Sequence, residues 1–323
     1  MSTARNVPET VDLTGDDARQ TLQEVGKGRL LKDAFTRLRY ADGFSHSRSL
    51  AFLGALVLVQ GIIAVVGLAS VLGTGEITRG IVRAIHDVAP GASGRLLTSA
   101  VDQARQNGTS GDTIAVVAGF AGAFISGTTA MGQLERGLNR IYGIERDRPT
   151  FRKYARAFGL ALSAGILLIV AFLAVGVGPS VGRAFDDNLL SDIWGWVRWP
   201  LALLATAGAV ALLFRWCPHR RQPGWSWLAF GSTISVALCF VITLAMGSLL
   251  RASSSFGDTY GPLAGIVALQ FWGLLTSIAI FFGGAVTAQL EAVRAGLSAP
   301  SDRPEDHAAA RARTRADAPA LVS

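Results

Sequence analysis

Residues 49–75 read SLAFLGALVLVQGIIAVVGLASVLGTG, and no charged side chain interrupts this run. A helix needs about 20 mainly apolar residues to cross the roughly 30 Å of hydrocarbon in a bilayer. The run exceeds that length and is too apolar for an ordinary surface helix of a soluble protein. We therefore predict a transmembrane helix at 49–73.

Five further runs have the same character. With the first run they give six predicted transmembrane helices, at 49–73, 113–134, 157–179, 199–215, 228–250 and 262–290. Of the 323 residues in the chain, 16% are charged, whereas soluble domains carry about 25%. We predict an all-α polytopic membrane protein whose membrane domain covers residues 49–291.

Lys and Arg residues set the predicted orientation, because loops rich in them stay in the cytoplasm. The segments 1–48, 135–156, 215–227 and 291–323 contain 23 of the 30 Lys and Arg residues. These segments alternate along the chain with poorly basic loops, so both termini are predicted to be cytoplasmic. The pattern is typical of a multi-pass protein of the bacterial cytoplasmic (inner) membrane.

The segments outside the six runs are predicted to lie at the membrane surface or beyond it. Residues 28–48 combine one apolar face with basic residues, which predicts an interfacial amphipathic helix. Residues 76–107 form two apolar stripes, which predict an extracytoplasmic helical hairpin; a docking surface for envelope proteins is the alternative. The tails 1–27 and 292–323 are polar and poor in large apolar residues, so we expect them to be disordered.

The sequence contains no recognisable catalytic or cofactor motif. The four histidines, His46, His86, His219 and His307, lie in separate segments without metal-ligand spacing. Neither a phosphate-binding glycine loop nor a serine elbow is present. The basic residues are spread beside apolar runs instead of forming one surface, which argues against a nucleic-acid partner. We expect no enzyme activity, no cofactor and no metal site.

Uncharged polar residues occur inside or beside the predicted helices. We take five of them as a candidate polar lining, with interhelical hydrogen bonds as the alternative: Gln60, Thr129, Gln133, Gln270 and Gln289. Small residues cover much of the run 113–134, which allows close helix packing. That packing fits a contact within the monomer, a homo-oligomer interface or a helix that moves during transport.

The end of the second run is rich in arginine. Residues 133–154 read QLERGLNRIYGIERDRPTFRKY, and spacings of three and four residues bring several of these side chains together on one helix. Clustered arginine between helices binds phosphate groups well. Our candidate site for a lipid headgroup consists of Arg136, Asn139, Arg140, Tyr142 and Arg148. The alternative is an ordinary cytoplasmic loop with local ion pairs.

Two stretches of the chain resemble the YihY/BrkB family of bacterial inner-membrane proteins. One is Leu138-Asn139-Arg140-Ile141-Tyr142-Gly143, followed by Glu145, Arg148 and Pro149. The other runs from Tyr260-Gly261-Pro262-Leu263-Ala264-Gly265 through Trp272 and Gly284 to Glu291. The order and spacing of the apolar runs also fit, so the resemblance covers roughly residues 40 to 292.

The resemblance implies a role in envelope integrity and the movement of a lipid or lipid precursor. We therefore expect a transporter or flippase-like protein for a lipid or another amphiphile, with membrane lipids as partners. The alternative is a non-transporting scaffold that organises envelope proteins. Some family members were once labelled ribonuclease BN, but this sequence shows no metal-ligand cluster to support that label.

Overall fold

The computed structural model describes residues 4–71, 79, 82, 97–103, 106, 113–145, 150–176, 188–252, 254–297 and 299–301. Within these residues the named elements are all helices, and the one β-type pairing is an isolated bridge between Ala4 and Ser301. The helices are α1 (Gly15–Val25), α2 (Lys27–Tyr40), α3 (Gly43–Val71), α6 (Thr113–Ile141), α7 (Thr150–Gly176), α9 (Asn188–Trp216), α10 (Trp225–Ala252) and α11 (Ser254–Arg294). The predicted all-α class is confirmed for the described part of the chain.

Five of the described helices contain stretches long and apolar enough to cross a membrane. These stretches are Gly43–Ala64, Arg152–Val175, Asp192–Trp216, Trp225–Leu250 and Ala264–Arg294. Helix α6 coincides with the predicted second span and has 29 residues, but its glycine, threonine and glutamine residues make it less apolar. A multi-pass membrane protein is therefore supported, while the count of six spans and their orientation stay predictions.

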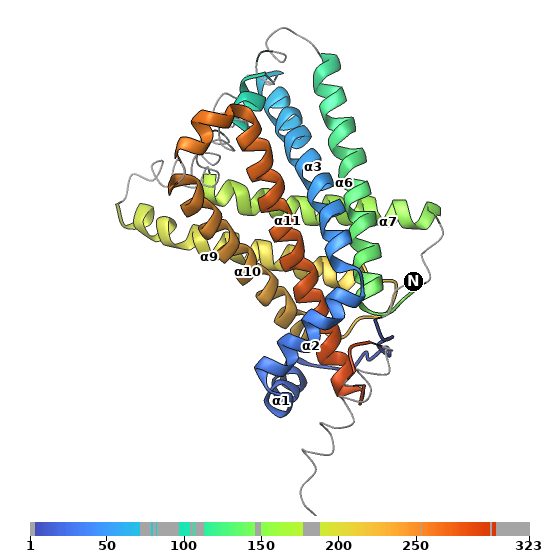
Figure 1. Cartoon of the computed structure of the whole chain (residues 1–323). Helices are drawn as coiled ribbons and strands as arrows, with labels where there is room; N and C mark the ends of the chain where they lie inside the picture. The colour runs from blue at the N-terminus through green and yellow to red at the C-terminus, as the bar shows by residue number, and fades with distance from the viewer. Residues whose placement is uncertain are drawn as a thin grey trace, which may run out of the picture.

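The six long helices of the described chain form a closed ring of contacts. Each packs against the next in the order α3, α6, α7, α9, α10 and α11, and α11 closes the ring on α3; α11 also contacts α6. In Figure 1, α3 and α6 rise together to the top of the view, whereas α7 and α9 run across them and extend to the left.

The tightly packed core lies at one end of the molecule. Its largest fully buried side chains come from α2, α6, α9, α10 and α11, and include Leu38, Tyr142, Phe214, Trp227 and Phe281. Farther along the helices, apolar side chains such as Leu162, Leu204 and Val241 are more than half exposed, as a lipid-facing surface requires. The buried end is the one that the loop charges assign to the cytoplasm.

The N-terminal segment differs from the expected disordered tail. Ala4 and Val7 are buried, and the Val7 N–H donates to the carbonyl oxygen of Tyr142 at 3.1 Å. Helix α1 then begins with a capping box between Thr14 and Asp17, whose hydrogen bonds lower the pKa of Asp17. Composition alone misses this order, because the few apolar residues of the segment gain their stability from surfaces distant in sequence.

Three other predicted segments are either divided between helices or lie largely outside the described residues. The predicted interfacial helix 28–48 is divided between α2 and the start of α3, and α2 packs against α11 through Leu30, Ala34 and Leu38. Most of the predicted outer hairpin, 76–107, lies outside the described residues. The same is true of residues 302–323 of the C-terminal tail and of Arg148.

Helices α3 and α6 approach each other closely where α6 has glycine. A Cβ atom added to Gly122 would lie 2.9 Å from Cδ of Gln60, and one added to Gly119 would lie 3.0 Å from a methyl group of Ile63. The small residues of α6 therefore serve packing within the chain.

Replacing Gly122 by leucine should lower the free energy of unfolding by about 1–3 kcal/mol, because the new side chain overpacks this contact. It should also displace Gln60 from the Ser126 hydroxyl that donates to it at 2.9 Å. Thermal unfolding of detergent-purified protein measures the effect. Gly54→Leu is the control, since Gly54 is exposed on α3 with open space around it; equal losses in both variants would contradict the prediction.

Candidate basic pocket at the predicted cytoplasmic end

The turn between α9 and α10, residues 217–224, forms the centre of the candidate site. Pro218, Pro223 and Gly224 interrupt the helical pattern here. The carbonyl oxygen of Gly224 accepts the N–H groups of Trp227 and Leu228, which starts α10. On the α6 side, Oδ1 of Asn139 accepts the backbone N–H of His219 at 2.7 Å. The turn is thus fixed from both sides.

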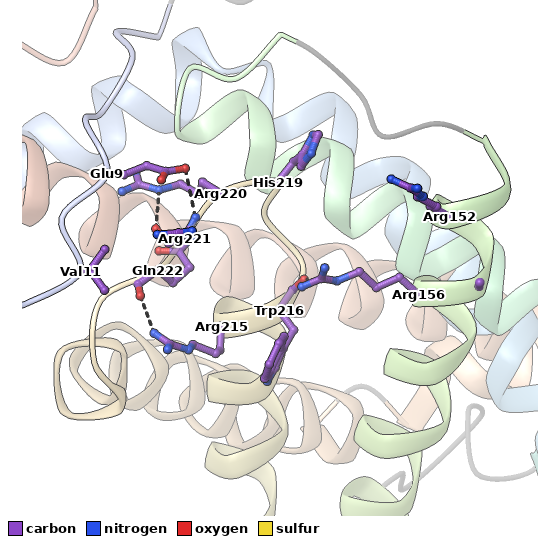
Figure 2. A pocket seen from close by; sticks show the side chains of 11 residues that line it. Glu9, Val11, Arg152, Arg156, Arg215, Trp216, His219, Arg220, Arg221 and Gln222 are labelled. Carbon is purple, nitrogen blue, oxygen red and sulfur yellow. Dashed lines mark hydrogen bonds between the residues drawn. The ribbon is translucent and has the colours of Figure 1, made fainter.

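A pocket of about 920 Å³ opens beside this turn (Figure 2). The first turns of α7, the end of α9, the 217–224 turn and the N-terminal segment all contribute to it. Its lining consists of Glu9, Val11, Arg152, Ala155, Arg156, Arg215, Trp216, His219, Arg220, Arg221 and Gln222. Five of these residues are arginines, and Glu9 is the one acidic side chain among the described residues that line the pocket.

Two of the arginines are held by uncharged groups. Nε of Arg156 donates to the carbonyl oxygen of Trp216 at 3.1 Å, and its guanidinium lies over the Trp216 ring at 5.5 Å. Arg215 donates to the carbonyl oxygens of Gln222 and Pro223 and lies over the ring of Trp225. These contacts fix the two side chains in place. Arg152 and Arg221 are exposed to solvent, and with five arginines the described lining of the pocket is strongly basic.

Arg220 has a different role from the other arginines. It pairs with Glu291 of α11, and the two side chains are 2% and 0% exposed. Its guanidinium also lies 4.6 Å from the ring centroid of Tyr142, whose pKa is raised by burial. The Thr10 hydroxyl donates to the same carboxylate. Arg220 is the one member of this buried cluster that lines the pocket, and the cluster joins the end of α6, α11 and the N-terminal segment.

A second buried arginine supports the same region from α2. Nε of Arg37 donates to Oε1 of Gln289 at 2.8 Å, and Nη1 donates to the carbonyl oxygens of Arg5 and Ile141 at 2.9 and 3.0 Å. Sequence reasoning missed Arg37, Arg220 and Glu291 as partners in this region. Their positions in three distant segments give no local spacing that could have paired them.

The structure separates the predicted headgroup residues. Asn139 and Tyr142 are buried beside the 217–224 turn, where one holds the turn and the other lies against Arg220. Arg136 is exposed and Arg140 half-buried on α6, and none of these four residues lines the pocket. The lining arginines come instead from α7, α9 and the following turn.

The predicted polar lining is not gathered into one cavity. Gln60 accepts the hydroxyl of Ser126, Gln133 pairs with the ring of His46 at 2.9 Å, and Gln289 binds Arg37. The hydroxyl of Thr129 donates to the Ile125 carbonyl within α6, and Gln270 is half-buried on α11. Three of the five therefore make contacts between helices, which was the alternative interpretation.

Within the described residues, no group of three or more His, Cys, Asp or Glu side chains lies close enough together to hold a metal ion.

Comparison with known proteins identifies the family of the chain. A family model described as Virulence factor BrkB matches residues 34–309. The ribonuclease-like protein YfkH of Bacillus subtilis (strain 168) is 25% identical over 268 residues, which cover 80% of this chain and 94% of that protein. No solved structure shows a significant match.

Two further relatives are described as UPF0761 membrane proteins. The one from Verminephrobacter eiseniae (strain EF01-2) is 26% identical over 56% of this chain and 43% of its own length. The one from Halorhodospira halophila (strain DSM 244 / SL1) is 23% identical over 61% of this chain and 43% of its own length. The chain thus spans less than half the length of these two relatives. Because the family model covers most of its residues, the chain belongs to the BrkB family of membrane proteins.

Proposed function

We propose that this protein is a transporter or flippase-like protein for an anionic lipid or a similar amphiphile in the bacterial inner membrane. The observation that carries the proposal is the arginine-rich pocket at the end of the molecule assigned to the cytoplasm. Arginine presents a planar fork of donors that matches phosphate oxygens, and basic pockets between helices bind lipid headgroups.

The surroundings of the pocket fit a ligand that lies at the membrane surface. Trp216 and Trp225 are about half exposed beside it, and indole rings favour the headgroup level of a bilayer. A soluble anion would gain no binding energy from these rings, whereas the headgroup of a lipid would lie at the same depth in the membrane as the rings.

One face of α7 leads from the pocket along an apolar surface. Ala155 lines the pocket, and Gly159, Leu162 and Ile166 follow on the same face at helical spacing. Leu162 and Ile166 are 56% and 53% exposed, and a Cβ atom added to Gly159 would meet no atom within 4 Å. An acyl chain can lie on this face while its headgroup occupies the pocket, which supports an amphiphile as the ligand.

Lipid scrambling in liposomes tests the proposal. Purified protein is reconstituted into vesicles that contain phosphatidylglycerol and a fluorescent lipid. A membrane-impermeant reductant bleaches the fluorophores of the outer leaflet, and the loss of the protected inner-leaflet fluorescence is followed over time. Wild type should accelerate scrambling, and Arg152→Ala/Arg221→Ala should slow it by about tenfold, the equivalent of about 1.4 kcal/mol in headgroup binding.

The matched control is Arg19→Ala/Arg39→Ala, which removes two arginines exposed on α1 and α2. It should scramble at the wild-type rate. A folded wild-type protein that scrambles no faster than empty vesicles, with several anionic lipids tried, would contradict the proposal and favour the scaffold alternative.

A further inference from the structure

Residues 4–14, here called the N-terminal strap, lie across the end of the molecule that contains the pocket. The strap is fixed at both ends by backbone hydrogen bonds: the Val7 N–H donates to the Tyr142 carbonyl at 3.1 Å, and the Gly224 N–H donates to the Leu13 carbonyl at 3.3 Å. Arg220 donates to the carbonyl oxygens of Val7 and Pro8 at 3.2 and 2.9 Å. The strap therefore bridges α6 and the 217–224 turn.

The middle of the strap reaches into the pocket. Glu9 and Val11 both line it, and Oε1 of Glu9 accepts the backbone N–H of Arg221 at 3.1 Å (Figure 2). Glu9 thus places a carboxylate at the wall of the arginine-lined pocket, on a backbone N–H of the 217–224 turn. Backbone N–H groups that donate to a carboxylate also bind phosphate oxygens, so Glu9 occupies the kind of position that an anionic headgroup requires.

We propose that Glu9 is a built-in competitor of the anionic ligand, and that its side chain must leave the pocket before a headgroup binds fully. This inference rests on the proposed function, because it concerns regulation of the same pocket.

The Glu9 side chain can move while the backbone of the strap stays in place. Ala4 and Val7 are buried, and Thr10, next to Glu9, binds the buried Glu291, whereas Pro8, Glu9 and Val11 are exposed. Exposed charge interactions contribute only about 0–1 kcal/mol, so a ligand can displace the Glu9 side chain while the anchors stay in place. The strap also precedes residues 34–309, which match the family model, so this device lies outside the matched region.

The test measures binding of dihexanoyl phosphatidic acid to the full-length protein in neutral detergent at low salt. Glu9→Gln removes the charge but keeps an oxygen that can accept the Arg221 N–H. It should bind the lipid about two- to fivefold more tightly than wild type, the factor that corresponds to roughly 0.4–1 kcal/mol. Asp12→Asn is the matched control, because Asp12 is an exposed acid of the same strap that does not line the pocket; it should bind like wild type.

The outcomes separate the inference from the proposed function. Equal gains in Glu9→Gln and Asp12→Asn would mean a general charge effect and would overturn the inference. Binding that falls in Arg152→Ala/Arg221→Ala but is unchanged in Glu9→Gln would overturn the inference alone. If neither wild type nor Glu9→Gln binds the lipid, both ideas fail. Binding of inorganic phosphate is measured separately. If phosphate binds as tightly as the lipid and gains the same factor in Glu9→Gln, the role of Glu9 as a competitor is supported, but the proposal that the ligand is an amphiphile is overturned.

Discussion

Replacing Glu291 by alanine is expected to lower the free energy of unfolding by about 3–5 kcal/mol, the usual result of removing one partner from a buried ion pair. Glu291 is fully buried and accepts hydrogen bonds from Arg220 and Thr10. Without the carboxylate, the guanidinium of Arg220 would stay buried against Tyr142 with no opposite charge. The thermal unfolding temperature of the purified protein in detergent is the measurement.

A double variant separates the ion pair from general damage to the core. Arg220→Met/Glu291→Leu removes both charges and keeps apolar volume, so it should lose less stability than Glu291→Ala alone. A single variant as stable as wild type would show that the pair does not hold α11 to the turn. A double variant less stable than the single one would show that packing, and not charge, dominates there.

The second large effect is expected at the crossing of α10 and α11. A Cβ atom added to Gly231 would overlap the Thr287 hydroxyl and lie 2.6 Å from the carbonyl oxygen of Gly283. One added to Gly283 would overlap the Ser235 hydroxyl and lie 2.5 Å from the carbonyl oxygen of Gly231. Backbone atoms cannot rotate away as a flexible side chain can. Gly231→Ala and Gly283→Ala should therefore each cost about 1–3 kcal/mol or more.

The same substitution elsewhere provides the control for this prediction. Gly165 lies in α7, and a Cβ atom added there would meet nothing within 4 Å. Alanine favours a helix over glycine by up to about 1 kcal/mol, so Gly165→Ala should keep or raise the unfolding temperature. If Gly231→Ala also raises it, the two helices do not make the close backbone contact described above.

The apolar runs were sufficient to predict the helical class, because length and lack of charge are local properties. They located the long helices only approximately: α9 begins at Asn188 and contains Pro200, whereas the run predicted a helix at 199–215. The small residues of α6 likewise predicted close packing, and Gly122 against Gln60 provides it. The order in which the long helices pack around the molecule was not predictable. It depends on which helix faces which, and the exposed apolar surfaces of membrane helices leave that choice open.

The four predicted headgroup residues that the structure describes lie at the same end of the helices as the pocket, but they do not line it. Helical spacing groups Arg136 with Arg140 on α6, and neither lines the pocket. The lining instead needs the contact between Arg156 of α7 and Trp216 at the end of α9. Residues 60 positions apart in the sequence carry no common spacing, so only tertiary packing brings these arginines together.

The position of the N-terminal strap also constrains the order in which the protein is made. Thr10 bonds to a residue 281 positions later in the chain, Gly15 to one 211 positions later, and Ala4 pairs with Ser301. The ribosome synthesises these partners only after most of the helices have left it. The contacts of the strap with these partners therefore form only after most of the membrane helices have been synthesised. Their formation is among the last steps in the biogenesis of the protein.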